Sequence, residues 1–299
     1  MDLNLLLAPC LALLLLVTAA AADTSIRLNN GLAFPTNTSI RLNNGLAFPA
    51  VSFGLQVYDN PTASKLTTVA LKAGIRNFFA SVLAQNQKGF GQAIAATDVP
   101  RQDIFICGSA NTASCSGFDD CYAQTKAACV QNLQSMKLAY LDMIMLDYPG
   151  SDCPSIQGQW KAFEEMYHNH TTKSIAVSNF SPQQLKCLPS NSTTPALNQL
   201  PYSIGHGSDT SVADNKALGD IVVQAYSPLG SGSILSDPDC VRIGKEHNKS
   251  SAQVALRWII QRNATFTTSA SSSEHFQQDL DIFDFELTAE DMKTLNAKK

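Results

Sequence analysis

One carboxyl group and three tyrosine phenols are the side chains along this chain that could take part in acid chemistry or ligand binding. Asp147 ends the apolar run at 141–147, and Tyr58, Tyr148 and Tyr226 follow or close similar runs. A carboxyl group at a strand end that faces a cleft can have a raised pKa and act as an acid. The tyrosines could line a ligand pocket there. The alternatives stay open: Asp147 as a solvated carboxylate without a Lys or His partner, and the tyrosines as amphipathic rim residues.

Eight short apolar runs, separated by helical stretches, are expected to position these side chains. The runs lie at residues 50–57, 75–80, 103–108, 141–147, 173–178, 195–200, 221–226 and 264–269. Most are continuously apolar, which is typical of strands buried on both faces. Residues 121–138 and 155–170 carry apolar side chains at helical spacing, and Ser250 or Ser251 is the expected N-cap of another helix. The pattern predicts an α/β protein, a single (β/α)8 TIM barrel with its working residues at the C-terminal strand ends.

A tandem repeat precedes the barrel. The segment TSIRLNNGLAFP occurs at 24–35 and again at 38–49, and Asn-Asn-Gly between apolar flanks predicts a short β-hairpin in each copy. We interpret the repeat as a tandem duplication or an error in the gene sequence. The expected organisation is a signal peptide at 1–22, a duplicated hairpin segment at 23–41 and a barrel domain at 42–299.

The N-terminus resembles a secretory leader. An apolar run at 5–17 is followed by three alanines before Asp23, which offers a cleavage site. Six N-x-[ST] acceptors, at Asn37, Asn169, Asn179, Asn191, Asn248 and Asn263, agree with this interpretation. We predict a secreted glycoprotein or one of the endomembrane lumen. A signal-anchored protein is the alternative, because the apolar character extends to Ala22.

Net charge and cysteine content limit the kinds of binding partner and the disulfide bonds that we expect. The net charge is −4 and no run of Lys or Arg occurs, so we expect no nucleic acid, no membrane contact beyond the leader, and a monomer. No C-x-x-C and no Cys/His cluster with zinc spacing exists, so no metal is expected. Eight cysteines become seven without the leader. We predict a disulfide between two of Cys115, Cys121 and Cys153, and a buried, apolar role for Cys107.

Nine segments in order along residues 42–297 resemble the aldo-keto reductase family. They are LNNGLAFPAVSFGLQVY, AGIRNFF, IFICGS, LAYLDMIMLDYP, IAVSNFSPQQL, ALNQLPYS, VVQAYSPLGSGSIL, SAQVALRWIIQRN and IFDFELTAEDMKTLN. The resemblance implies a (β/α)8 barrel that reduces carbonyl compounds with NADPH. It also implies four catalytic groups: a Tyr general acid, a Lys that lowers the pKa of that Tyr, an Asp paired with the Lys, and a His that orients the carbonyl group.

None of these four catalytic residues is present at the matching positions. Phe79 stands at the place of the Asp, Ala84 at that of the Tyr, Ser109 at that of the Lys and Asp147 at that of the His. Asn86, two residues after the Tyr position, keeps its place in the pattern. The resemblance therefore predicts a degenerate catalytic site.

The positions that would bind the nicotinamide half of the cofactor are retained. By resemblance, Ser178, Asn179 and Gln199 bind the carboxamide and Tyr226 stacks on the ring. The loop that follows carries further cofactor positions, Ser227, Leu229 and Ser231.

The positions that would bind the adenosine 2′-phosphate have lost their cations. Ser269 replaces a Lys, His275 replaces an Arg, and Asp279 stands where an Asn usually contacts adenine. Each charge-assisted phosphate contact contributes about 1.5–3 kcal/mol. We therefore expect NADP binding to be weak or lost.

These features lead to two functional predictions. The first is an aldo-keto-reductase-like protein of the secretory pathway, inactive as a classical carbonyl reductase, a pseudoenzyme or a barrel that binds a small ligand at its mouth. The alternative is an NAD(P)H-dependent oxidoreductase that acts on aldehydes or ketones with atypical catalytic residues.

Overall fold

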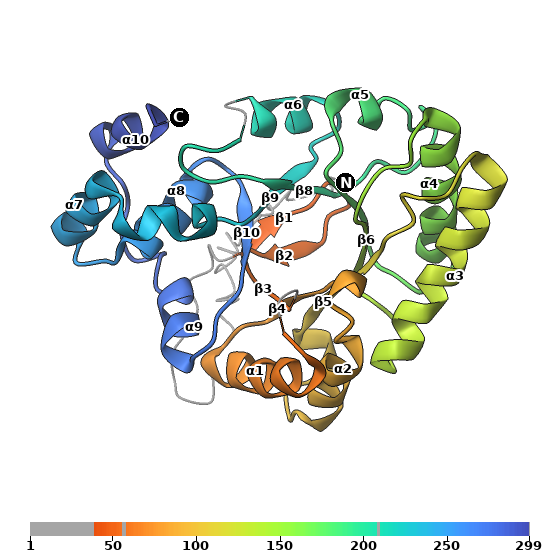
Figure 1. Cartoon of the computed structure of the whole chain (residues 1–299), viewed down its shortest axis with the longest axis horizontal. Helices are drawn as coiled ribbons and strands as arrows, with labels where there is room; N and C mark the ends of the chain where they lie inside the picture. Colours follow the sequence, from red (N-terminus) through yellow and green to blue (C-terminus); the bar gives the residue numbers. More distant parts are fainter. Residues whose placement is uncertain (1–38, 56–57, 208–209, 299) are drawn as a thin grey trace, which may run out of the picture. The chain divides into compact units, whose positions relative to one another are not determined.

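Eight parallel strands close into a barrel, as predicted (Figure 1). The computed structural model describes residues 39–55, 58–207 and 210–298. The strands, each within or overlapping one of the apolar runs, are β3 (Val51–Gly54), β4 (Asn77–Ala80), β5 (Phe105–Ala110), β6 (Met143–Leu146), β7 (Ile175–Ser178), β8 (Leu197–Pro201), β9 (Val222–Tyr226) and β10 (Thr265–Thr268). β10 pairs with both β9 and β3, which closes the ring.

Helices surround the ring of strands (Figure 1). The α-helices are α1 (Asn60–Ala73), α2 (Gln87–Ala96), α3 (Phe118–Met136), α4 (Cys153–His168), α5 (Pro182–Leu185), α6 (Ser211–Ala217), α7 (Pro238–His247), α8 (Ser251–Gln261), α9 (Ser273–Leu280) and α10 (Ala289–Asn296). Short 3₁₀ helices are η1 (Val82–Ala84), η2 (Arg101–Asp103) and η3 (Gly230–Ser236). Ser250 is the N-cap of α8, and with Gln253 it forms a capping box. Among the described residues, no helix is long and apolar enough to cross a membrane.

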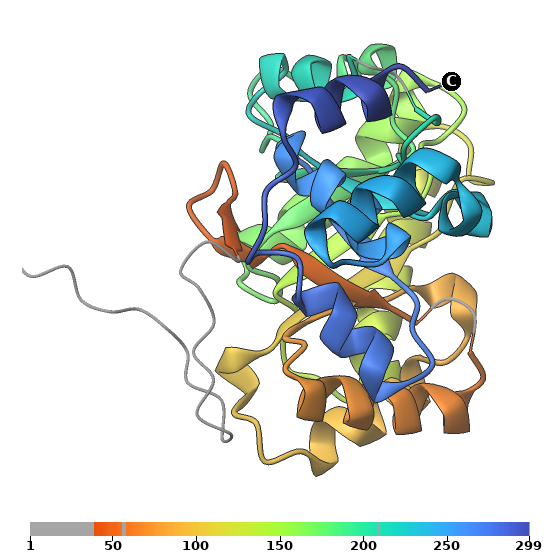
Figure 2. The same cartoon turned by 90° about the vertical axis from the view of Figure 1, so that its left-hand side faces the viewer.

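A short hairpin precedes the barrel, as predicted (Figure 2). β1 (Ser39–Arg41) and β2 (Ala47–Pro49) pair antiparallel within the second repeat copy. Gly45 occupies the turn with a φ of 87°, a conformation that favours glycine. The hairpin starts three residues before the predicted domain boundary at residue 42. The predicted leader at 1–22 and the first repeat copy lie outside the described residues.

The interior of the barrel is apolar on the side of β4 to β8. One buried cluster joins the hairpin to these strands and comprises Leu42, Phe48, Phe79, Phe105, Cys107, Met143, Met145, Ala176, Ala196 and Leu197. Cys107 therefore has the buried, apolar position that was predicted. A second cluster fills the space between strands and helices. It includes Trp160 and Trp258, and the latter ring stacks on Tyr202 at a centroid distance of 5.3 Å.

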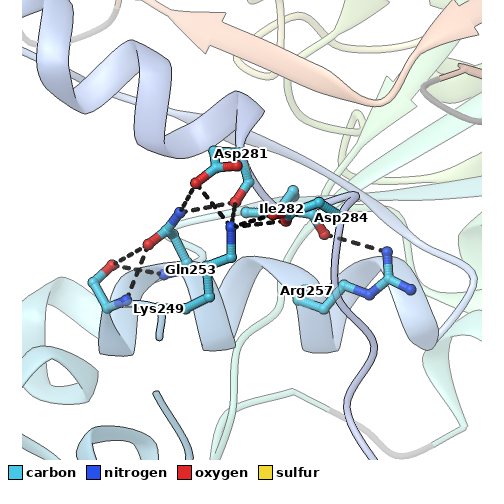
Figure 3. Close-up of polar contacts among 7 residues, drawn as sticks. Lys249, Gln253, Arg257, Asp281, Ile282 and Asp284 are labelled. Carbon is cyan, nitrogen blue, oxygen red and sulfur yellow. Dashed lines mark hydrogen bonds and ion pairs between the residues drawn. The ribbon is translucent and has the colours of Figure 1, made fainter. Parts of the chain in front are cut away.

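A polar cluster fixes the segment that follows α9 (Figure 3). The Lys249 ammonium group lies 2.8 Å from a carboxylate oxygen of Asp281 and 2.7 Å from one of Asp284. The Gln253 amide donates to the Asp281 backbone carbonyl at 2.8 Å. The side chain of Lys249 is only 8% exposed, so these contacts compensate a cation that is largely withdrawn from water. The cluster thereby holds the end of α9 against the start of α8.

The described residues contain two disulfides, and one of them confirms the prediction. Cys115 and Cys121 are bonded at the start of α3. Cys153 is bonded to Cys187, which the sequence analysis did not consider. This second bond joins the start of α4 to the residues after α5. The loops that lead into these two helices follow β6 and β7 at the C-terminal face of the barrel.

The Cys153–Cys187 bond should stabilise the barrel mainly by restricting the unfolded chain. It closes a loop with a sequence separation of 34 residues, for which chain entropy predicts about 3–4 kcal/mol. We expect the Cys153→Ser and Cys187→Ser variants each to lower the free energy of unfolding by about this amount. The double variant should cost no more, since one loss already opens the loop. Urea unfolding without reductant measures this, and an unchanged midpoint in all three variants would contradict it.

Candidate functional site

The four positions predicted to have lost their catalytic residues lie at the C-terminal ends of neighbouring strands. Phe79 is on β4, Ser109 on β5, and Asp147 follows β6 directly. Ala84 ends η1, which comes after β4. The structure brings two of them into contact, because the Ser109 hydroxyl donates to Asp147 Oδ2 at 2.8 Å. Phe79 packs instead into the apolar interior below them.

Asp147 is the acidic side chain at this end of β6, and it is not solvated. Its side chain is buried, with a relative exposure of 4% for the residue. Burial disfavours the ionised form and raises the pKa of Asp147 to about 7, although the hydrogen bond from Ser109 opposes this rise. The interpretation as a solvated carboxylate was therefore wrong, and the raised pKa of an acid at a strand end is what the structure shows.

Asn179 links Asp147 to the predicted cofactor residues. Its side-chain amide donates to the backbone carbonyl of Asp147 at 2.9 Å and to the Ser178 hydroxyl at 3.1 Å. Its side-chain oxygen accepts a hydrogen bond from the Tyr226 hydroxyl at 3.0 Å. Asn179 has a φ of 63°, which turns the chain sharply after β7. The end of β6, the turn after β7 and the end of β9 thus form one polar network.

Gln199, the remaining residue predicted to bind the nicotinamide half of the cofactor, is hydrogen-bonded to residues of the neighbouring strands. The Gln199 amide donates to the side-chain oxygen of Gln224 on β9 at 2.8 Å. The backbone carbonyl of Gln199 accepts from the Ser178 hydroxyl at 2.9 Å. Burial raises the pKa of Tyr226, with a smaller contribution from Tyr148 nearby, so the Tyr226 phenol stays neutral. The residue types and their placement on three adjacent strands fit a carboxamide and a flat ring.

A cavity of about 760 Å³ lies beside Tyr226 and the loop that follows β9. Ser227 and Ser231, both predicted as cofactor residues, line it. Lys298 also lines the cavity, and its ammonium group lies 2.8 Å from a carboxylate oxygen of Asp237. Sequence reasoning missed Lys298, because nothing in its local pattern connects the end of the chain with the loop after β9. Leu229 packs against the hydrophobic core instead.

The positions after β10 carry no permanent cation. Ser269 and His275 are both exposed, and residues 264–280 contain no Lys or Arg. Asp279 is buried and accepts a hydrogen bond from the Thr268 hydroxyl at 2.7 Å. Burial raises its pKa to about 7. The negative charge expected there is therefore only partly present at neutral pH, but nothing at these positions replaces the missing cations.

Tyr58 belongs to this second region and not to the surroundings of Asp147. Its hydroxyl donates to the backbone carbonyl of Ala270 at 2.9 Å, and burial raises its pKa. The Asn86 side chain donates to the carbonyls of Leu55 and Tyr58. Of the three tyrosines, the structure places Tyr148 and Tyr226 near each other and Tyr58 on the β10 side.

Comparison with known proteins agrees with the fold and the motifs. The model of the Aldo/keto reductase family matches residues 46–299. An aldo-keto reductase of Mycolicibacterium smegmatis is 31% identical over 280 residues, which are 93% of this chain and 91% of that protein. Glyoxal reductase of Bacillus subtilis is 30% identical over 277 residues, 91% and 92% of the two chains. A crystal structure of an aldo/keto reductase from Brucella melitensis superimposes with a TM-score of 0.79 at 29% identity, over 86% and 98% of the chains.

These relatives overturn the main functional prediction. It described a pseudoenzyme of the secretory pathway, whereas relatives that match most of the chain are named as reductases. The prediction rested on the absence of the four catalytic residues and of the phosphate-binding cations, and on the leader-like N-terminus. Of the two readings left open for Asp147, it relied on the solvated carboxylate, whereas burial leaves a protonatable group at the barrel mouth. The alternative, an oxidoreductase, agrees better with the relatives.

The predicted secreted, lumenal or signal-anchored localisation is corrected by the same finding. The Mycolicibacterium smegmatis and Bacillus subtilis relatives are aldo-keto and glyoxal reductases of bacteria, and their names indicate no secretory role. The leader prediction rested on the hydrophobicity of a short run, which is a property of that segment and not of the barrel. Its residues lie outside the described part of the chain, and the relatives lend it no support.

The family model, the relatives and the barrel structure agree with one another over nearly all of the described chain. This chain belongs to the aldo/keto reductase family.

Proposed function

We propose that this protein is an NAD(P)H-dependent oxidoreductase that reduces aldehydes or ketones with atypical catalytic residues. The observation that carries the proposal is the buried pair of Asp147 and Ser109 at the barrel mouth, joined at 2.8 Å. A general acid works best when its pKa lies near the operating pH, and burial brings that of Asp147 to about 7. The reductase names of the relatives support the same reaction class.

In this proposal each residue has one task. Protonated Asp147 donates its proton to the carbonyl oxygen of the substrate. The Ser109 hydroxyl, which donates to Asp147 Oδ2, then stabilises the carboxylate that remains. Asn179 holds the backbone of Asp147 and the hydroxyl of Tyr226, so the acid and the aromatic ring keep a fixed relation. Phe79, buried below, keeps the floor of the site apolar and limits access of water.

The residues of the nicotinamide half fit a nicotinamide cofactor, which supplies the hydride when bound. Gln199, Asn179 and Ser178 offer amide and hydroxyl groups for its carboxamide, and Tyr226 offers a ring face. The positions after β10 offer no permanent cation for a 2′-phosphate. We therefore propose weak NADPH binding, with little preference over NADH. All of these residues come from one barrel, so a monomer with a small carbonyl compound at its mouth suffices.

Asp147→Asn should remove most of the activity. Loss of a general acid lowers kcat by about 10²–10⁴-fold. In the wild type, kcat should be highest below pH 7 and fall as the pH rises through about 7, since only protonated Asp147 donates. Reduction of glyoxal and of an aromatic aldehyde, followed through cofactor absorbance, measures kcat and its pH dependence. Asp220→Asn, at an exposed carboxyl group, is the control and should change neither kcat nor its pH dependence. A fully active Asp147→Asn variant, or a rate that rises through pH 7, would refute the proposal.

Restoring the cations should restore a preference for NADPH. The double variant Ser269→Lys/His275→Arg adds two charge-assisted contacts for the 2′-phosphate. We expect it to bind NADPH about 100-fold or more tightly than the wild type does. Its Kd for NADH, which lacks that phosphate, should stay within a few-fold as the internal control. Calorimetric titration gives both constants. Equal gains for the two cofactors would show that these residues do not face the phosphate.

A further inference from the structure

A buried asparagine on α3 holds the residue that contacts the proposed acid. The Asn132 amide donates to the backbone carbonyl of Ser109 at 2.6 Å. Its side-chain oxygen accepts from the Ser109 backbone N–H at 3.1 Å. Asn132 is fully buried, so no water competes for either contact. The backbone N–H and the backbone carbonyl of Ser109 are thus both held by a single side chain from a helix.

A second amide extends this clamp to β4. The Gln87 amide, at the start of α2, donates to Asn132 Oδ1 at 2.7 Å and to the carbonyl of Ala80 at 2.8 Å. The approach of α3 to β5 is close: a Cβ atom on Gly108 would lie 2.6 Å from Asn132 Oδ1. The glycine before Ser109 therefore makes room for the clamp. Two helices and two strand ends share one buried network.

The network decides where the Ser109 hydroxyl points. Ser109 Oγ accepts a hydrogen bond from the Val82 N–H at 3.0 Å. Its own proton then goes to Asp147 Oδ2 at 2.8 Å, in preference to Ser81 Oγ at 3.4 Å. Asn132 holds both the backbone N–H and the backbone carbonyl of Ser109. Because the backbone of Ser109 is fixed in this way, its hydroxyl stays within hydrogen-bond distance of the Asp147 carboxyl group.

We propose that Asn132 is a positioning residue for the acid, acting through Ser109 and supported by Gln87. The inference rests on the proposed function for its catalytic meaning, but the coupling of Asn132 to Asp147 is a property of the structure alone. Ser109 is the side chain that hydrogen-bonds with the Asp147 carboxyl group among the described residues. Asn179 holds only the backbone carbonyl of Asp147, so among the described residues the carboxyl group itself depends on Ser109 for its side-chain hydrogen bond.

The other groups close to Asp147 do not bring a charge that would change with pH alongside the carboxyl group. Cys107 on β5 is close enough to sense its charge, but burial raises the pKa of that thiol well above its usual value, so it stays neutral. Asn179 after β7 and Ser81 after β4 are neutral at all ordinary pH values. A change in the titration of Asp147 can therefore be traced to Ser109.

The decisive experiment is a carboxyl ¹³C NMR titration of the full chain, with the Asp147 signal assigned from Asp147→Asn. Removing the Ser109 hydrogen bond takes away the contact that favours the carboxylate, so the pKa of Asp147 must rise. We expect Asn132→Leu and Ser109→Ala each to raise its midpoint by about one unit. The double variant should show no further rise, because both changes remove the same contact.

Asn215→Leu is the matched control. Asn215 on α6 is also buried, and its side-chain oxygen accepts from Asn198 on β8 at 3.0 Å, away from Asp147. This variant should lose stability and leave the Asp147 midpoint unchanged. If Asn132→Leu does not fold, Gln87→Leu carries the same test, with a smaller rise expected.

Two results would overturn the inference: an unchanged midpoint in Asn132→Leu while Ser109→Ala shifts it, or full additivity in the double variant. For the fallback variant, an unchanged midpoint in Gln87→Leu has the same meaning. The titration needs no turnover, so it remains decisive if the wild type reduces no aldehyde. A wild type that reduces no aldehyde would count against the proposed function alone. If turnover is present, the pH at which kcat falls should move upward in Asn132→Leu together with the NMR midpoint.

Discussion

Closure of the parallel strand ring is the constraint on which the rest of this structure depends. β10 pairs with β9 on one side and with β3 on the other, so the barrel sheet has no open edge and its eight strands run in one direction. Each strand therefore ends at the same face. Side chains that are far apart in sequence, such as Ser109 and Asp147, meet there because their strands are neighbours in the ring.

Charge is distributed unequally between the two ends of β6. Asp142, just before the strand, pairs with Arg101 at 2.7 Å and Lys173 at 2.9 Å. Asp147, just after the strand, has the Ser109 hydroxyl as its partner and forms no ion pair with any residue that the structure describes. A hydroxyl group supports a carboxylate without cancelling its desolvation, so burial dominates and the pKa rises. The same residue type thus forms ion pairs at one end of the strand and is a buried, protonatable group without an ion pair at the other.

The cofactor region shows a similar division. Amides and hydroxyls on β7, β8 and β9 are mutually hydrogen-bonded and retain the polar surface that suits a carboxamide. After β10, the buried acid Asp279 and the exposed Ser269 and His275 stand where strong phosphate contacts need permanent cations. Polar groups that suit a carboxamide are thus present on one side of the site, while permanent cations that suit a phosphate group are absent from residues 264–280.

The sequence by itself determined the barrel, its eight strands, the hairpin and the family. Continuous apolar runs and helical periodicity are local signals, and they reported the elements correctly. They also located Phe79, Ser109 and Asp147 at strand ends. What only the tertiary structure decided was the state of those residues. Burial of Asp147, its contact with Ser109, the Asn132 clamp, and the Cys153–Cys187 bond all join segments that no local pattern connects. A side chain's pKa depends on how much water and which partners surround it, and this is settled only when the strands are packed side by side.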